Sequence, residues 1–198
     1  MKIVFDFDGT LHQTHIIYKK AMDTSLKEIG LSLKDIDFKS LIGKSPYDIW
    51  RSLGAKEEQI SYLVHKTGSM MDEGMKEYGK LYEGVYESLE YLKKKYELII
   101  CSNCRRAYME AARSAYGLDK YFSSYIIGED YDFLNKASIL RSLDLKSFIM
   151  VGDRDNDIEA GYKNKMPSIF ASYGYGDKSE GDKANFVIND ISEIKSII

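Results

Sequence analysis

A short apolar strand that ends on two aspartates constrains the fold of this chain more than any other feature. The pattern predicts a buried strand at Lys2–Phe5, and Asp6, Asp8 and Gly9 follow it almost directly. Burying an unpaired carboxylate is very unfavourable, so these two aspartates need a cation or water beside them. The carboxyl end of a strand in an open α/β sheet offers both, because ligands bind there. We therefore expect Asp6 and Asp8 at a functional edge of a parallel sheet.

Predicted strands alternate with predicted helices over most of the chain. Apolar runs predict strands at 97–101, 124–127, 147–151, 167–171 and 186–188, and helical spacing predicts helices at 85–92, 105–116, 134–143 and 158–165. This alternation is typical of a doubly wound parallel sheet. The segment after the first strand shows only helical patterns, at 16–29, 35–42, 47–53 and 57–82. We predict an α/β core, residues 1–12 and 83–198, with a small all-helical cap domain, residues 13–82, inserted over the end of the first strand.

The composition is that of an ordinary globular protein. Of 198 residues, 44% are hydrophobic and 30% charged, and the net charge is −3 with scattered basic residues, so we expect no nucleic-acid partner. Apolar runs are too short for a membrane span, and the first residues lack the apolar region of a signal peptide. Two cysteines cannot build a disulfide framework, which favours a cytoplasmic location. A monomer and a homodimer both remain open.

Further polar residues follow two other predicted strands. Ser102 and Asn103 end the second strand and Asp153 ends the fourth, so a parallel sheet would bring them to the edge where the first strand ends. Asp157 comes four residues after Asp153, and a helical turn there would place both carboxylates near one point. Clustered acids repel each other unless a cation lies among them, and hard oxygen ligands with room for water suit Mg²⁺. Alternatively, Asp157 only favours the start of a helix through the helix dipole.

These motifs occur together in a characteristic order. The chain contains Asp6-Phe7-Asp8-Gly9-Thr10-Leu11, then Cys101-Ser102-Asn103, Lys136, and Gly152-Asp153-Arg154-Asp155-Asn156-Asp157, with smaller echoes at Gly84-Val85 and Gly174-Tyr175-Gly176. The set resembles the haloacid dehalogenase superfamily in its phosphatase branch. Within that branch it is similar to the phosphoglycolate phosphatase and β-phosphoglucomutase group, which has a Rossmann-like core and a helical cap.

The resemblance implies a Mg²⁺-dependent phosphatase acting on a small phosphorylated metabolite such as phosphoglycolate or a sugar phosphate. Asp6 would be the nucleophile that forms an aspartyl-phosphate, and Asp8 would be the general acid and then the general base. The implied metal ligands are the Asp6 side chain, the Asp8 backbone carbonyl, Asp153 and Asp157.

The resemblance also implies a phosphate-binding set made of Gly9, Ser102, Asn103 and Lys136, whose lysine would neutralise phosphoryl charge. Where the family usually has Lys-Pro, this chain has Lys136-Ala137. Ser102 could instead simply cap the helix that follows it.

Substrate choice is expected to come from the cap. Lys44 stands in a stretch, residues 41–46, that resembles the family's substrate loop, and Arg105 stands beside the phosphate loop. Both are candidates for contacting an anionic leaving group, although Lys44 could equally be an exposed loop lysine. His12 and Gln13 follow the first motif, and we expect them to line the entrance to the site.

Several functions remain open at this stage. The leading hypothesis is the phosphatase. The alternatives are a β-phosphoglucomutase-like phosphomutase and a non-catalytic phospho-ligand-binding protein on the same fold. A dehalogenase is disfavoured because Asp8 and the other acids would have no metal to hold. Cys101 and Cys104 have the spacing of a thiol redox motif, but Cys101 ends an apolar strand and is expected to be a buried small hydrophobe.

Overall fold

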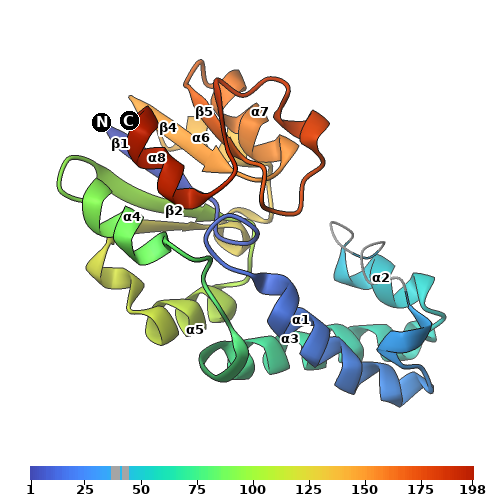
Figure 1. The fold of residues 1–198 in the computed structure, drawn as a ribbon. Helices are drawn as coiled ribbons and strands as arrows, with labels where there is room; N and C mark the ends of the chain where they lie inside the picture. The colour runs from blue at the N-terminus through green and yellow to red at the C-terminus, as the bar shows by residue number, and fades with distance from the viewer. Residues whose placement is uncertain (37–40, 42–44) are drawn as a thin grey trace. The chain divides into compact units, whose positions relative to one another are not determined.

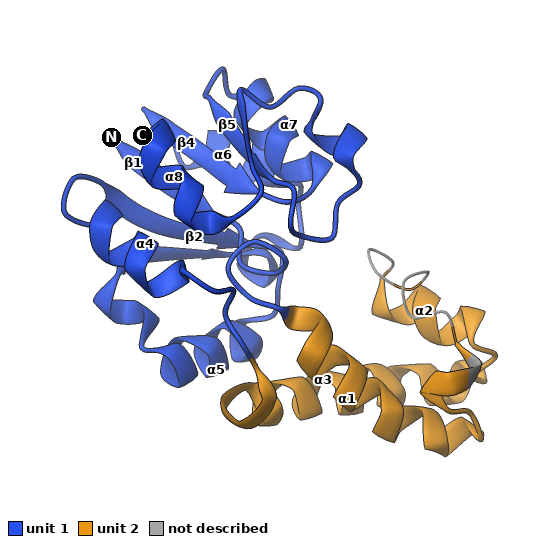
Figure 2. Ribbon diagram, in the orientation of Figure 1, with its two compact units in different colours: residues 1–13, 80–198 blue, residues 14–79 orange. Residues whose placement is uncertain are grey.

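The computed structural model describes residues 1–36, 41 and 45–198, and these form two compact units (Figure 2). Unit 1 contains residues 1–13 and 80–198, and unit 2 contains residues 14–79. Most of the helix predicted at 35–42 lies outside the described residues. Among the helices that the structure describes, none is both long and apolar enough to cross a bilayer.

Unit 1 is built on a parallel six-stranded sheet with the order β3-β2-β1-β4-β5-β6 (Figure 1). The chain order runs outward from β1 in one direction through β2 and β3, and from β4 in the other, which is the doubly wound topology that the sequence predicts. The strands are β1 (Lys2–Phe5), β2 (Glu97–Ser102), β3 (Phe122–Ile127), β4 (Phe148–Gly152), β5 (Ser168–Ala171) and β6 (Phe186–Ile188).

Helices cover both faces of this sheet. They are α4 (Val85–Leu92), α5 (Arg106–Tyr116), α6 (Lys136–Ser142), α7 (Asp155–Lys163) and α8 (Ile194–Ile197). In Figure 1, α4 and α8 lie in front of the sheet and α6 lies behind it. Short 3-10 turns connect several elements, at Lys27–Ile29, Leu33–Asp35, Leu118–Lys120, Gly128–Tyr131, Lys178–Gly181 and Ile191–Glu193.

The central strands are continuous apolar runs because both of their faces are buried. Ile3, Val4 and Phe5 of β1 are all fully buried. On one face, Val4 belongs to a cluster with side chains from β2, β3, β4, α6 and α7; its other members are Ile99, Cys101, Ile126, Ala137, Ile139, Leu140, Phe148, Met150 and Ala160. This burial makes the strands rigid supports for whatever stands at their ends.

Unit 2 is helical in its described part. It consists of α1 (Thr14–Leu26), α2 (Pro46–Ser52) and α3 (Glu57–Tyr78). The core of unit 2 contains Met22, Leu26, Leu41, Ile49, Trp50, Ile60 and Leu63. The helix predicted at 57–82 is too long at its end: α3 stops at Tyr78 because the next residues pair with the loop after β1. In that pairing the backbone amide of Gln13 donates to the Lys80 carbonyl, and the backbone amide of Tyr82 donates to the Leu11 carbonyl.

Candidate active site

The first strand and the fourth strand bring two aspartates to the same edge of the sheet. Phe5 of β1 pairs with Val151 of β4, and the Asp6 amide donates to the Val151 carbonyl at 2.8 Å. Asp6 and Asp153 therefore follow neighbouring strands at the point where the strand order reverses. In doubly wound sheets this switch point opens a crevice at the carboxyl ends of the strands.

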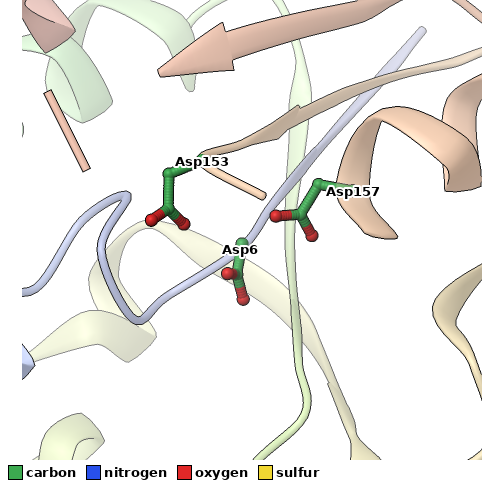
Figure 3. Close-up of side chains that lie close together, drawn as sticks. All are labelled: Asp6, Asp153 and Asp157. Atoms are coloured by element: carbon green, nitrogen blue, oxygen red, sulfur yellow. The ribbon is translucent and has the colours of Figure 1, made fainter. Parts of the chain in front are cut away.

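Asp157 joins these two aspartates from the first turn of α7. One carboxylate oxygen from each of Asp6, Asp153 and Asp157 lies within 4.8 Å of the others. Figure 3 shows the three side chains close together, on the chain after β1, the chain after β4 and the start of α7. All three are buried, with Asp6 6% exposed and the other two fully enclosed. Such close, buried carboxyl groups need positive charge among them.

Lys136 supplies part of that positive charge. It is the first residue of α6, whose start is capped by the Asn135 side chain, and it is 4% exposed. Its Nζ lies 2.8 Å from Asp6 Oδ1 and 2.5 Å from Asp157 Oδ1. A buried ammonium is tolerated here because two carboxylates accept its hydrogens. The helix predicted at 134–143 is shorter in the structure, and its first residue is Lys136, whose side chain lies in the cluster.

The pKa values of the carboxyl groups and of Lys136 in this cluster are strongly shifted. Burial, and then the charges of the neighbouring carboxyl groups, raise the pKa of Asp153 to about 8. Burial also raises the pKa of Asp157 to about 7, although Lys136 opposes the shift, and it raises the pKa of Asp6. Burial acts to lower the pKa of Lys136, but the Asp157 and Asp6 carboxylates outweigh it and raise this pKa. One lysine against three carboxylates leaves two negative charges, which is the deficit that a divalent cation fills.

Hydrogen bonds fix the direction of the two carboxyl groups that flank Asp6. The Tyr175 amide donates to Asp153 Oδ2 at 2.7 Å, and Thr10 Oγ1 donates to Asp153 Oδ1 at 3.2 Å. The Arg154 amide donates to Asp157 Oδ2 at 3.1 Å. Asp157 thus acts as the helix-start acid of the alternative interpretation and contacts Lys136 as well. The two roles use different oxygens of the same carboxylate.

A glycine makes the close approach of the loop after β1 possible. Gly9 has φ +79°, a left-handed conformation that residues with a Cβ rarely adopt. A Cβ on Gly9 would lie 2.2 Å from Asp153 Oδ2. The loop can therefore pass against the carboxyl cluster only with glycine at this position.

The Asp8 side chain has partners outside the three-carboxylate cluster. It is half-buried, and Tyr108 Oη of α5 donates to its Oδ1 at 2.7 Å. Ser102 Oγ, at the end of β2, donates to its Oδ2 at 3.3 Å. Asp6 and Asp8 are two residues apart, yet one faces the buried acids and the other faces two hydroxyl groups. Asp6 therefore lies among buried charges, whereas the Asp8 side chain accepts hydrogen bonds from neutral hydroxyl groups.

Comparisons with known proteins agree with this geometry. The family profile described as haloacid dehalogenase-like hydrolase matches residues 3–171. The chain belongs to the haloacid dehalogenase-like hydrolases. Its relatives include a phosphoglycolate phosphatase of Agrobacterium fabrum, 26% identical, with 88% of this chain and 81% of the relative covered. They also include the pyrophosphatase PpaX of Listeria welshimeri, 29% identical, with 99% and 95% covered.

A solved structure shares the fold of the hydrolase. CbbY from Rhodobacter sphaeroides, crystallised in complex with phosphate, matches with a TM-score of 0.80 and 17% identity, over 98% of this chain and 95% of that one. These comparisons confirm the resemblance to the phosphatase branch of the family and the prediction of a hydrolase of phosphatase type.

The predicted phosphate loop of the hydrolase follows β2. Ser102 is the last residue of β2 and is 2% exposed, whereas Asn103 is exposed. The alternative that Ser102 caps the next helix is wrong, because α5 begins at Arg106 and Arg105 occupies the N-cap position. Arg105 is half-buried at that position. Gly128, after β3, lies against Asn103, since a Cβ there would be 2.4 Å from Asn103 Oδ1.

His12 and Gln13 were predicted to line the entrance to the site, and Lys44 to contact the leaving group. His12 does not line an entrance: it is fully buried, and its ring stacks on Phe7 with 5.0 Å between centroids. The half-buried Gln13 donates from Nε2 to the Leu81 carbonyl at 3.0 Å, which ties the loop after β1 to the returning chain. Lys44 lies outside the described residues.

The cysteines of the hydrolase are buried and free. Burial raises the pKa of Cys101 to about 12, and it raises the pKa of Cys104 as well. The thiolate is the reactive form of cysteine. Both side chains therefore behave as small apolar groups near the loop, which agrees with the expectation for Cys101.

Three residues that contact the aspartates were not predicted from the sequence: Thr10, Tyr108 and Tyr175. Thr10 and Tyr175 belong to motifs already noted, but their contacts with Asp153 depend on the folded loop. Tyr108 has no motif of its own, and its spacing within α5 is that of an ordinary core residue.

Proposed function

We propose that this hydrolase is a Mg²⁺-dependent phosphatase that cleaves a small phosphomonoester through an aspartyl-phosphate on Asp6. The observation that carries the proposal is the buried cluster at the carboxyl edge of the sheet. There Lys136 Nζ lies 2.8 Å from Asp6 Oδ1, and one oxygen from each of Asp153 and Asp157 lies within 4.8 Å of an Asp6 oxygen. A carboxylate held against a cation can approach a phosphate dianion, which an isolated buried carboxylate cannot do.

The donor set fits a hard divalent cation. The Asp6, Asp153 and Asp157 carboxylates, together with the Asp8 backbone carbonyl, would hold Mg²⁺, and all of these donors are oxygens. When bound, the cation shields the charges of the nucleophile and the phosphate and orients both. The two negative charges that Lys136 leaves uncompensated match the charge of one such ion.

The reaction then divides between two aspartates. Asp6 Oδ attacks phosphorus, and the phosphorus–oxygen bond to the leaving alcohol breaks. Asp8 gives its carboxyl proton to the leaving oxygen, so an alcohol departs and an aspartyl-phosphate remains. Asp8 then takes a proton from water, which attacks the phosphorus and regenerates the Asp6 carboxylate with release of phosphate. Lys136, Ser102 and the backbone amide at Asn103 hold the phosphoryl oxygens during both displacements. The predicted role of Gly9 in binding phosphate is not supported, because its amide donates to the His12 carbonyl at 2.9 Å.

The relatives suggest two substrates to test first. A phosphoglycolate phosphatase and a pyrophosphatase both lie among the matches at 26–29% identity. Phosphoglycolate is the small phosphomonoester we favour, and inorganic pyrophosphate is the second candidate. Both carry an anionic leaving group, which a basic side chain such as Arg105 could contact.

The test is the hydrolysis of p-nitrophenyl phosphate, phosphoglycolate, pyrophosphate and a sugar phosphate, with Mg²⁺ and with a chelator. Wild type should hydrolyse at least one of them only with Mg²⁺, and Asp6→Asn should be inactive although folded. Asp155→Asn is the matched control, because Asp155 is an exposed carboxylate in the same motif and lies outside the cluster. Full activity of Asp6→Asn would refute the nucleophile. Isomerisation of the sugar phosphate without phosphate release would indicate a mutase, and binding without turnover a non-catalytic protein.

A further inference from the structure

A series of buried and partly buried hydrogen bonds in unit 1 leads from Tyr116 to Asp8. Tyr108 Oη lies 2.7 Å from Asp8 Oδ1 and 3.3 Å from His12 Nδ1. His12 Nε2 lies 2.9 Å from Tyr116 Oη. His12 is fully buried and Tyr108 is 4% exposed, so bulk water does not compete for the contact between them.

The donor and acceptor roles of Tyr108, His12 and Tyr116 give this series of hydrogen bonds a direction. A tyrosine hydroxyl has one hydrogen, and Tyr108 uses it on Asp8, so toward His12 its oxygen can only accept. His12 must then carry a hydrogen on Nδ1, and in the neutral imidazole Nε2 accepts from Tyr116. Every donor in the series therefore points toward Asp8.

The ring of Tyr108 is held in place by aromatic packing. It meets Phe7 edge-on, with 6.2 Å between centroids and 74° between planes, and it meets His12 edge-on at 6.4 Å. His12 in turn stacks on Phe7. The hydroxyl of Tyr108 thus has little freedom to leave Asp8, since its ring extends from α5 and packs against Phe7 and His12 in the loop after β1.

We propose that Tyr108 is a positioning residue that, backed by His12 and Tyr116, holds the Asp8 carboxyl group in the orientation needed for proton transfer to the leaving group. The bond to Oδ1 fixes the rotation of the carboxyl group. The other oxygen, Oδ2, accepts from Ser102 at the longer distance of 3.3 Å. The inference rests on the proposed function, in which Asp8 is the general acid.

The test compares two substrates that differ in their need for that acid. Phenyl phosphate and p-nitrophenyl phosphate have nearly the same shape, but nitrophenolate leaves readily without a proton and phenolate does not. The parameter to compare is kcat/KM, which covers the steps up to departure of the leaving group. Tyr108→Phe keeps the ring and removes only the hydroxyl, so its fall in kcat/KM should be about tenfold or more for phenyl phosphate and much smaller for p-nitrophenyl phosphate.

A matched control removes an equivalent hydrogen bond elsewhere. Tyr125 Oη donates to the Asp119 carboxylate, also at 2.7 Å, at an exposed site away from Asp8. Tyr125→Phe should leave both kcat/KM values unchanged. An equal fall on both substrates in Tyr108→Phe, or no fall on either, would overturn the inference, since a merely structural residue does not distinguish leaving groups. If Tyr108→Phe folds poorly, Tyr116→Phe, which removes the hydroxyl 2.9 Å from His12 Nε2, must show a selective fall on phenyl phosphate.

Two further variants separate this inference from the proposed function. Asp8→Asn should show the same selective loss on phenyl phosphate, because it removes the acid itself. If Asp8→Asn shows it and Tyr108→Phe does not, the role of Tyr108 is wrong and the phosphatase stands. If Asp8→Asn retains wild-type activity on both substrates, Asp8 is not the acid, and both fail. If Asp6→Asn alone remains active, the nucleophile assignment fails, independently of the Tyr108 contact.

Discussion

Replacing Asp153 with asparagine should stabilise the metal-free protein at pH 8, and a divalent cation should cancel most of that gain by stabilising wild type. In the metal-free protein the pKa of Asp153 rises from 3.8 to about 8 on folding. A carboxyl group whose pKa is higher in the folded state adds no penalty below pH 4. Its penalty grows as the pH rises from about 4 to about 8, because the folded protein must take up a proton that the unfolded chain has released. Metal-free wild type should therefore lose stability over that range.

The size of the effect follows from the shift. Each pH unit above 3.8 costs about 1.4 kcal/mol until the folded pKa is reached, so the penalty is about 2 kcal/mol at pH 5 and about 5 kcal/mol at pH 8. The substituted asparagine side chain would carry no charge, but it cannot accept from both Tyr175 and Thr10, and that loss costs about 1–3 kcal/mol. Without metal, Asp153→Asn should be near neutral at pH 5 and more stable than wild type by about 2–4 kcal/mol at pH 8.

Urea unfolding at pH 5 and pH 8, with a chelator and with Mg²⁺, measures both effects. Saturating Mg²⁺ at a hundred times its dissociation constant should stabilise wild type at pH 8 by about 3 kcal/mol and stabilise Asp153→Asn far less. Asp155→Asn, which removes an exposed carboxylate from the same turn, should respond to Mg²⁺ as wild type does. Equal stabilisation of wild type and Asp153→Asn by Mg²⁺, or a metal-free stability that does not fall toward pH 8, would refute the electrostatic reasoning.

Three further outcomes are expected. Lys136→Met should abolish activity and lower the free energy of unfolding at neutral pH by about 3–5 kcal/mol, because it leaves buried carboxylates unpaired; a urea titration that shows no loss would contradict this. Gly9→Ala should destabilise more than Gly30→Ala, whose glycine also has positive φ but has open space around it and should cost only about 1–2 kcal/mol; equal melting temperatures would count against the close approach of the loop. Iodoacetamide at pH 8 should label Cys101 and Cys104 only after unfolding, and rapid labelling of the folded protein, followed by mass spectrometry, would disprove their burial as thiols.

The central strands β1, β2, β4 and β5 could be predicted from the sequence because they are buried on both sides and are therefore mostly apolar. The edge strands β3 and β6 are partly exposed, yet all six predicted runs correspond to strands in the structure. The ends of helices were harder. The helical pattern continues past Tyr78, yet α3 stops there because the following residues bond to the loop after β1, which lies far earlier in the sequence. The four residues of α8 are too few to show a helical period.

The residues of the site show the same contrast between local sequence patterns and contacts across the fold. Asp6, Asp153 and Asp157 could be predicted because each is the polar end of its own strand or the start of its own helix, and the parallel order brings such ends together. Nothing local marks Tyr108: it lies beside Met109 on the buried side of α5, as any core aromatic would. Its contact with Asp8 joins residues one hundred positions apart, and it exists because α5 packs where the loop after β1 turns. The sequence around Asp6 and Asp8 therefore indicates the chemistry to test, whereas the residues that contact these aspartates are determined by the packing of the fold.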